Sequence, residues 1–91
     1  LYGPGHFLTR HDDRHPTHQR IAAWVLSMTP EWDENWGGHL AFYDEAGNVV
    51  EAFKPVFNTL NLFTVPQHHA VQLVTPFAGA QRTSYLGWLL A

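Results

Sequence analysis

Short apolar runs separated by Gly, Pro, Asn and Asp recur along the whole chain. No apolar stripe with a helical period persists for three turns, so the pattern is typical of β-strands and not of amphipathic helices. The chain is predicted to form seven strands, at residues 6–10, 20–28, 39–44, 49–53, 58–65, 68–74 and 82–91. This spacing leaves no room for crossover helices, which favours an all-β antiparallel sandwich or jelly roll.

Individual runs predict where some strands lie in the fold. The run "RIAAWVLSM" is apolar on both faces, so we expect it to be buried between layers. The last run, "RTSYLGWLLA", is long enough to be a central strand. "HLAFYD" and "VVEAF" predict a hairpin around the turn "EAGN", which Lys54-Pro55 ends. "TPEWDENWGG" predicts an irregular connection.

Composition narrows the class of protein. With 91 residues, 45% of them hydrophobic and 14% charged, the chain is expected to be one globular domain with a thin core. It lacks the unbroken apolar run of a membrane helix, so no membrane association is expected. The net charge is −3 with a single lysine, so the chain has no basic stripe and direct nucleic-acid binding is not expected.

The chain contains no cysteine. This excludes disulfides, thiolate-bound zinc and cysteine catalysis, and it predicts a cytoplasmic protein. The chain opens at Leu1-Tyr2 without a methionine, which predicts that it is a piece of a longer protein.

The stretch "FLTRHDDRHPTHQR" holds three of the seven histidines and two adjacent aspartates. His11 and Asp13 are two residues apart, so an extended backbone would place both side chains on one face, with Cα atoms roughly 6 to 7 Å apart. Asp12 would then point the other way. Imidazole and carboxylate together suit a first-row divalent metal, and a second histidine would complete a facial triad typical of non-haem Fe(II). The alternative is a solvated surface triplet.

The third ligand is predicted to come from the adjacent pair His68-His69. Neighbouring residues in a strand face opposite ways, so only one of the two can bind the metal. His69 would share a face with Val71 and Leu73, which suits the interior, so His69 is the predicted ligand. The remaining histidines are expected in loops or at the surface: His6, His15, His18 and His39.

Arg82 and Ser84 form a second candidate for binding chemistry. They are two residues apart at the start of the last predicted strand and would share a face. A guanidinium fork beside a hydroxyl can anchor one end of a dicarboxylate. The alternative is an ordinary strand arginine paired with Asp44 or Glu51.

Five stretches together resemble a known family. In order, "YGPGHFLTRHDD", "WGGHLAFYD", "FNTLNLF", "HHAVQLV" and "RTSYLGW" resemble the catalytic core of the Fe(II)/2-oxoglutarate-dependent oxygenases. The similarity is strongest to the prolyl 4-hydroxylase-like branch, particularly the ribosomal-protein prolyl hydroxylases, whose metal motif also reads H-D-D. It implies that residues 1–91 form one catalytic core with a double-stranded β-helix, or jelly-roll, fold.

The resemblance also implies roles for single residues. His11, Asp13 and His69 would hold Fe(II), while Arg82 and Ser84 would bind the distal carboxylate of 2-oxoglutarate. Residues expected to line the co-substrate or substrate pocket are Tyr2, Trp88, Leu40 beside Gly37-Gly38, and Asn58, while Arg14 would lie in a loop at its mouth. Ser27 stands where many relatives have a tyrosine that bonds the co-substrate. The helices that normally precede the first strand are absent, so an apolar sheet face should be exposed.

The activity implied by the resemblance is hydroxylation of a C–H bond, with Fe(II), 2-oxoglutarate and O₂, release of succinate and CO₂, and ascorbate as reductant. The implied substrate is a prolyl residue in a peptide or protein, with free amino acids as a lesser possibility. Two alternatives stay open at this point. One is a cupin-like jelly roll or a degenerate oxygenase, which binds metal or ligand without turnover. The serine at position 27 favours this alternative. The other is a structural β-sandwich, in which His11, Asp13 and His69 would not converge.

Overall fold

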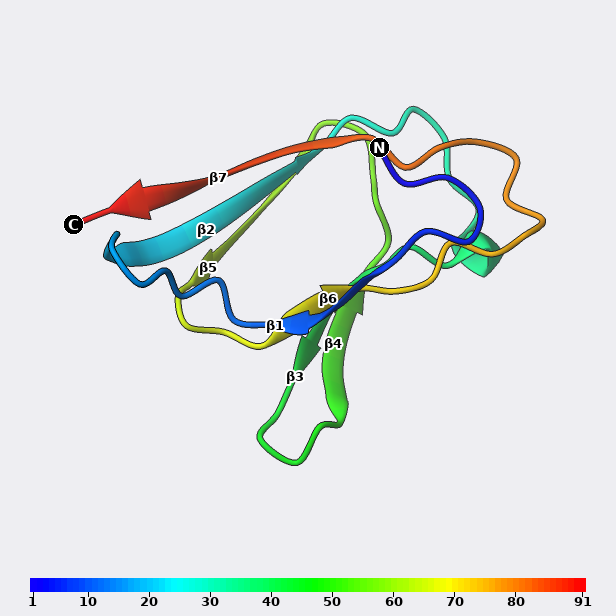
Figure 1. The fold of residues 1–91 in the computed structure, drawn as a ribbon. Coiled ribbons are helices and arrows are strands. Elements are labelled where there is room, and N and C mark those ends of the chain that lie inside the picture. The colour runs from blue at the N-terminus through cyan, green and yellow to red at the C-terminus, as the bar shows by residue number, and fades with distance from the viewer.

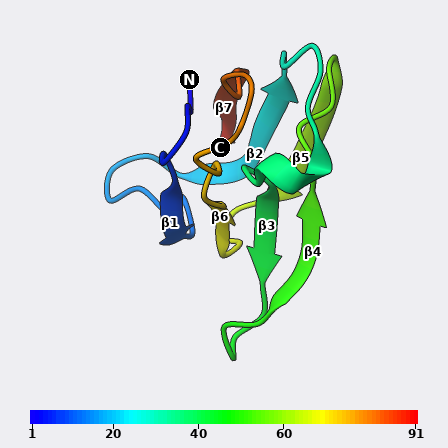
Figure 2. The ribbon, with the colours of Figure 1, turned by 90° about the vertical axis from the view of Figure 1, so that its right-hand side faces the viewer.

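The computed structural model describes residues 1–91, which form two antiparallel β-sheets and one helical turn. The two sheets lie in separate layers (Figure 1 and Figure 2). The four-stranded sheet has the order β1 (Leu8–His11), β6 (His69–Val71), β3 (Leu40–Tyr43) and β4 (Val49–Phe53). The three-stranded sheet has the order β5 (Thr59–Thr64), β2 (Arg20–Ser27) and β7 (Ser84–Leu90). The predicted all-β jelly roll is confirmed.

β2 is the central strand of the three-stranded sheet and pairs with β5 on one side and β7 on the other. The prediction that this strand is buried between layers is wrong, because only one of its faces meets the other sheet, and only Ala23 and Ser27 in it are buried. β7 is an edge strand, and the prediction that the last run would be central is wrong. A long apolar run indicates a strand, but its neighbours are decided by the path of the whole chain.

β6 ends at Val71, three residues earlier than predicted. Beyond it, the Gln72 amide donates to the His39 carbonyl and the Val74 amide donates to the His6 carbonyl, so the chain is held by two different segments. The strict alternation of faces ends there. Leu73 is 51% exposed and does not share the buried face of His69, contrary to the prediction.

The hairpin of β3 and β4 forms as predicted, with its turn at residues 44–48. The Asp44 carboxylate accepts a hydrogen bond from the Asn48 amide at 2.9 Å, and Gly47 adopts a φ of 87°. Such a positive φ is accessible to glycine without steric cost. β4 ends at Phe53, just before Lys54-Pro55.

The connection between β2 and β3 is mostly irregular, as predicted, but contains one 3-10 turn, η1 (Glu34–Trp36). The Asp33 side chain caps this turn by accepting a hydrogen bond from the Asn35 amide at 2.8 Å. Trp32 is buried beside the turn, and its indole N–H donates to the Gly37 carbonyl. This single helical turn is far too short to span a lipid bilayer.

The faces of the three-stranded sheet differ in what they contact. Ala23 on β2 and Trp88 on β7, which are cross-strand partners, line a cavity between the two sheets. The alternate residues face outward, and Leu60, Leu62 and Tyr85 are largely exposed. In residues 1–91 the outer face of this sheet is therefore apolar and uncovered, as predicted.

Candidate metal and co-substrate site

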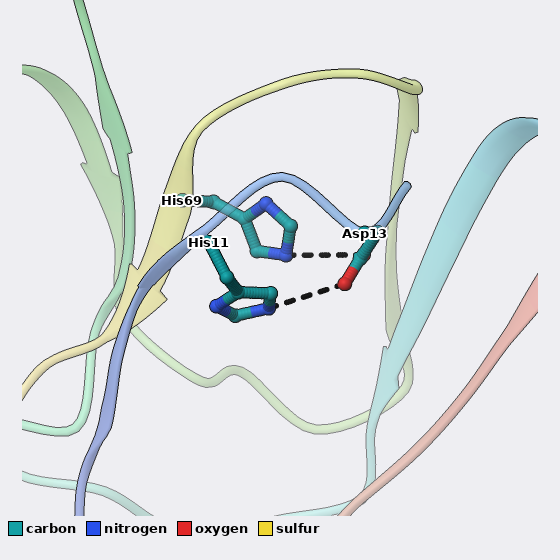
Figure 3. Close-up of side chains that lie close together, drawn as sticks. All are labelled: His11, Asp13 and His69. Atoms are coloured by element: carbon teal, nitrogen blue, oxygen red, sulfur yellow. Dashed lines mark ion pairs between the residues drawn. The ribbon is translucent and has the colours of Figure 1, made fainter. Parts of the chain in front are cut away.

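His11, Asp13 and His69 converge at one point (Figure 3). His11 ends β1 and His69 begins β6, and the two residues are cross-strand partners in the antiparallel register. Their ring centroids are 4.1 Å apart. The Asp13 carboxylate lies 3.2 Å from the Nε2 atom of each histidine. The candidate ligand atoms all lie within 4.8 Å of one another, which contradicts the structural β-sandwich alternative.

Asp13 reaches this point through a turn and not through strand alternation. β1 ends at His11, and Asp13 has a φ of 64°, in the left-handed region that few residues other than glycine adopt. The expected extended backbone from His11 to Asp13 is therefore wrong. Asp12 does not join the cluster, because hydrogen bonds from the backbone and side chain of Arg14 hold its carboxylate. These bonds also lower the pKa of Asp12.

The backbone fixes which nitrogen each imidazole presents. The Nδ1 atom of His11 lies 2.7 Å from the Thr9 carbonyl, and the Nδ1 atom of His69 lies 2.6 Å from the Gln67 carbonyl. A carbonyl oxygen can only accept a hydrogen bond, so both Nδ1 atoms carry the proton. In the neutral imidazole, the nitrogen that faces Asp13 is then the unprotonated Nε2, which is the atom that can bind a metal ion.

These donor atoms fit a divalent cation. Two imidazole lone pairs and a carboxylate that face one another repel unless a proton or a metal ion lies between them. Burial lowers the pKa of His69, which disfavours the protonated imidazole. Two histidines that bind through Nε2, together with one carboxylate, form the facial set of non-haem Fe(II) sites, which leaves coordination positions free for other ligands.

Two phenylalanines that the sequence did not single out pack beside His69. The Phe63 ring stands edge-on to His69 with centroids 4.7 Å apart, and Phe42 packs against Phe63 at 5.0 Å. Phe63 lies on β5 and alternates with the outward Leu60 and Leu62. That alternation was the available sequence signal, but it does not say which face points inward.

The metal-ligand cluster opens into a cavity of about 200 Å³ between the sheets. Five further residues that the sequence analysis selected line the same cavity: Tyr2, Leu40, Arg82, Ser84 and Trp88. Most of the remaining wall is apolar. One cavity therefore combines the metal-ligand cluster with the predicted anion-binding arginine.

Arg82 is 3% exposed and has no carboxylate partner. Its Nε donates to the Gly38 carbonyl at 2.7 Å, and one terminal nitrogen donates to the Ser84 hydroxyl at 3.2 Å. The alternative pairing with Asp44 or Glu51 is wrong. Burial lowers the pKa of Arg82 because the charged form loses hydration. An uncompensated buried guanidinium favours the binding of an anion.

The Gly37-Gly38 pair lets the chain pass close to Arg82. Gly38 has a φ of 64°, and a Cβ atom there would lie 3.3 Å from Cδ of Arg82 and 3.2 Å from the Trp32 ring. The adjacent Gly37 faces the Leu73 carbonyl so closely that no side chain fits. Glycine at both positions thus allows the Gly38 carbonyl to accept the Arg82 hydrogen bond.

Three predicted site residues lie outside the cavity lining. Ser27 is buried, and its hydroxyl has no hydrogen-bond partner. It is the cross-strand partner of Ser84, which lines the cavity, but Ser27 itself does not. Asn58 is exposed, and its amide donates to the Ser27 carbonyl. Arg14 is exposed and pairs with Asp12 at 2.7 Å.

Comparison with known proteins gives matches over nearly the whole chain. Residues 1–90 match the 2OG-Fe(II) oxygenase superfamily. A solved Pseudomonas putida prolyl-4-hydroxylase is 31% identical with a TM-score of 0.79, and the match covers 96% of this chain and 46% of that one. A search of curated proteins finds no match.

A second solved structure is a prolyl hydroxylase in complex with a hypoxia inducible factor oxygen degradation domain peptide fragment, from Trichoplax adhaerens. It is 27% identical with a TM-score of 0.79, and the match covers 98% of this chain and 40% of that one. The chain therefore spans less than half the length of these two structures.

Proposed function

The chain belongs to the 2OG-Fe(II) oxygenase superfamily, and we propose that residues 1–91 form the catalytic core of an Fe(II)- and 2-oxoglutarate-dependent dioxygenase. The observation that carries this proposal is the pairing of two features in one cavity. The first is the His11–Asp13–His69 cluster, and the second is the buried Arg82 without a counterion.

Each group would have a separate task. Fe(II), when bound, supplies the O₂ activation that couples oxidation of 2-oxoglutarate to oxidation of a substrate C–H bond. His11, Asp13 and His69 hold the ion and leave open positions for co-substrate and O₂. Arg82 and Ser84 bind the distal carboxylate. One oxygen atom of O₂ then ends in succinate and the other in the hydroxyl group, while C1 of 2-oxoglutarate leaves as CO₂.

A prolyl residue in a peptide or protein is the proposed substrate, with a free amino acid as the lesser alternative. Both solved relatives are prolyl hydroxylases, and one of them holds a peptide. Leu40, Phe63 and Trp88 give the cavity an apolar wall that suits a pyrrolidine ring. Contact of Arg14 with the peptide, the use of ascorbate as reductant and a cytoplasmic location stay predictions.

Succinate formation tests the proposal. The full-length protein is incubated with Fe(II), ascorbate, 2-oxoglutarate and prolyl peptides, and we expect succinate and a product 16 Da heavier than the peptide. His11→Ala and Arg82→Ala should reduce succinate to background, because they remove a metal ligand and the carboxylate anchor. Arg10→Lys, a change on the other side of β1, should retain the activity.

The second candidate is a jelly roll that binds metal and 2-oxoglutarate without turnover. Ser27 favours it, because its buried hydroxyl does not reach the cavity, whereas the family resemblance implies a tyrosine at this position that binds the co-substrate. Binding of Mn(II) and 2-oxoglutarate without any succinate, across prolyl peptides and free amino acids, would replace the dioxygenase proposal with this one.

A further inference from the structure

Arg20 connects the metal-ligand turn to the wall of the cavity. It is the first residue of β2, and its guanidinium carbon lies 3.7 Å from the centroid of the Trp88 ring. A terminal nitrogen of the same guanidinium donates a hydrogen bond to the backbone carbonyl of Asp13 at 3.2 Å. One side chain thus contacts both a candidate metal ligand and the aromatic residue that lines the cavity beside it.

The backbone of Asp13 needs such a restraint. Its left-handed conformation is uncommon for a residue with a side chain, and no regular strand holds it, because β1 has ended at His11. The direction of the Asp13 carboxylate follows from this backbone conformation. A charged donor makes the stronger class of hydrogen bond to the carbonyl, so Arg20 can keep the turn in this conformation.

We propose that Arg20 is a positioning residue, which directs the Asp13 carboxylate toward the metal ion by holding the Asp13 carbonyl while it stacks on Trp88. This inference rests on the metal site of the proposed function. Arg20 forms no ion pair with a carboxylate, so its charge is not already committed to a surface salt bridge.

Only a planar guanidinium lets the side chain of Arg20 stack on Trp88 and donate a hydrogen bond to the Asp13 carbonyl at the same time. Arginine can lay its flat face on an aromatic ring while its edge donates hydrogen bonds, whereas a lysine ammonium offers only a compact charge. Arg20→Lys therefore keeps the charge and removes the combined geometry. Arg10 offers a matched control, because it lies 5.8 Å from the Tyr43 ring centroid and donates to the Asp44 carbonyl, outside the cavity lining.

The test measures Mn(II) affinity in the full-length protein by isothermal titration calorimetry, with Arg20→Lys, Arg20→Gln and Arg10→Lys beside the wild type. All proteins are measured well below their melting temperatures, so that only folded protein is compared. We expect Arg20→Lys to bind Mn(II) about 10- to 100-fold more weakly, the range found when partners of metal ligands are removed. Arg10→Lys should bind as the wild type does.

The Co(II) ligand-field spectrum separates positioning from general stability. A turned Asp13 carboxylate changes the coordination geometry, so Arg20→Lys should shift the visible bands, and Arg10→Lys should not. Wild-type affinity together with a wild-type spectrum in Arg20→Lys overturns the inference. If Arg20→Lys does not fold, the same two measurements on Arg20→Gln decide in the same way. A wild-type protein that binds no Mn(II) overturns both this inference and the proposed function.

Discussion

At the scale of single residues, the site depends on which side-chain nitrogens are already hydrogen-bonded and which remain free. His11 and His69 use Nδ1 to bond carbonyls two residues earlier, which leaves Nε2 free for a metal ion. Arg82 gives Nε to the Gly38 carbonyl and one terminal nitrogen to Ser84, so its remaining N–H groups are free for an anion. In both cases the fold orients a side chain by bonding one end of it.

Metal binding should stabilise the fold through His69 and not through its neighbour His68, which lies outside the ligand cluster. A ligand that binds only the folded state adds about 2.7 kcal/mol at 100 times its Kd. We therefore expect Mn(II) to raise the Tm of the wild type and of His68→Ala, but not that of His69→Ala. Thermal melts with Mn(II) and after EDTA measure this. Equal shifts in the two variants would contradict the ligand assignment.

Gly38 should be required for co-substrate binding for two reasons. One is its positive φ, and the other is the lack of a side chain that would press on Arg82. Gly38→Ala puts a Cβ atom against Cδ of Arg82, whereas Gly47→Ala at a φ of 87° meets open space. Both changes force alanine into the left-handed region and should cost about 1–2 kcal/mol of stability. Only Gly38→Ala should weaken binding of 2-oxoglutarate, measured by calorimetry with Mn(II). Equal affinities in the two variants would show that Arg82 tolerates the contact.

At the scale of elements, the sequence predicts strands better than it predicts where they end and what they pair with. The β3–β4 hairpin was predictable because its turn residues and alternation are local signals. The end of β6 at Val71, the edge position of β7 and the turn at Asp13 were not, because pairing with distant segments decides them. The grouping of His11, Asp13 and His69 was still predictable, because their residue types and the family resemblance do not depend on those details.

The pairing of β2 with β7 should depend on Gly87. Trp24 is its cross-strand partner, and the indole ring covers Gly87 so closely that a Cβ atom would overlap it. We expect Gly87→Ala to lower the free energy of unfolding by about 1–3 kcal/mol, because the ring must leave its packed position. Urea denaturation measures this change.

Repeating the Gly87→Ala substitution in a Trp24→Ala background provides the control. With the ring absent, the added methyl group meets no obstacle, so the cost of Gly87→Ala should largely disappear. Such a coupling is expected of residues in direct contact. An equal cost in both backgrounds would mean that the strain lies in the backbone and not in the Trp24 contact.

At the scale of the whole molecule, the inner and outer faces of the two sheets have different surroundings. The inner faces share the cavity that holds the candidate metal ligands and Arg82, and five of the buried residues line it: Ala23, Leu40, His69, Val71 and Arg82. The outer face of the three-stranded sheet carries Leu60, Leu62 and Tyr85, which are 57%, 62% and 63% exposed. A contiguous apolar face of this kind is rare on monomeric proteins and favours association.

Residues 1–91 alone should therefore self-associate through this outer face. Leu60→Thr with Leu62→Thr keeps the β propensity of β5 and removes apolar surface, so it should reduce association. Val49→Thr, on the exposed strand β4 and outside the hollow that Leu62 lines, makes the same kind of change and should not. Sedimentation velocity over a range of concentrations measures the effect. Because Leu60 and Leu62 point away from the cavity, Mn(II) affinity should stay at the wild-type value, and a loss of affinity would mean that the substitution disturbs the sheet itself.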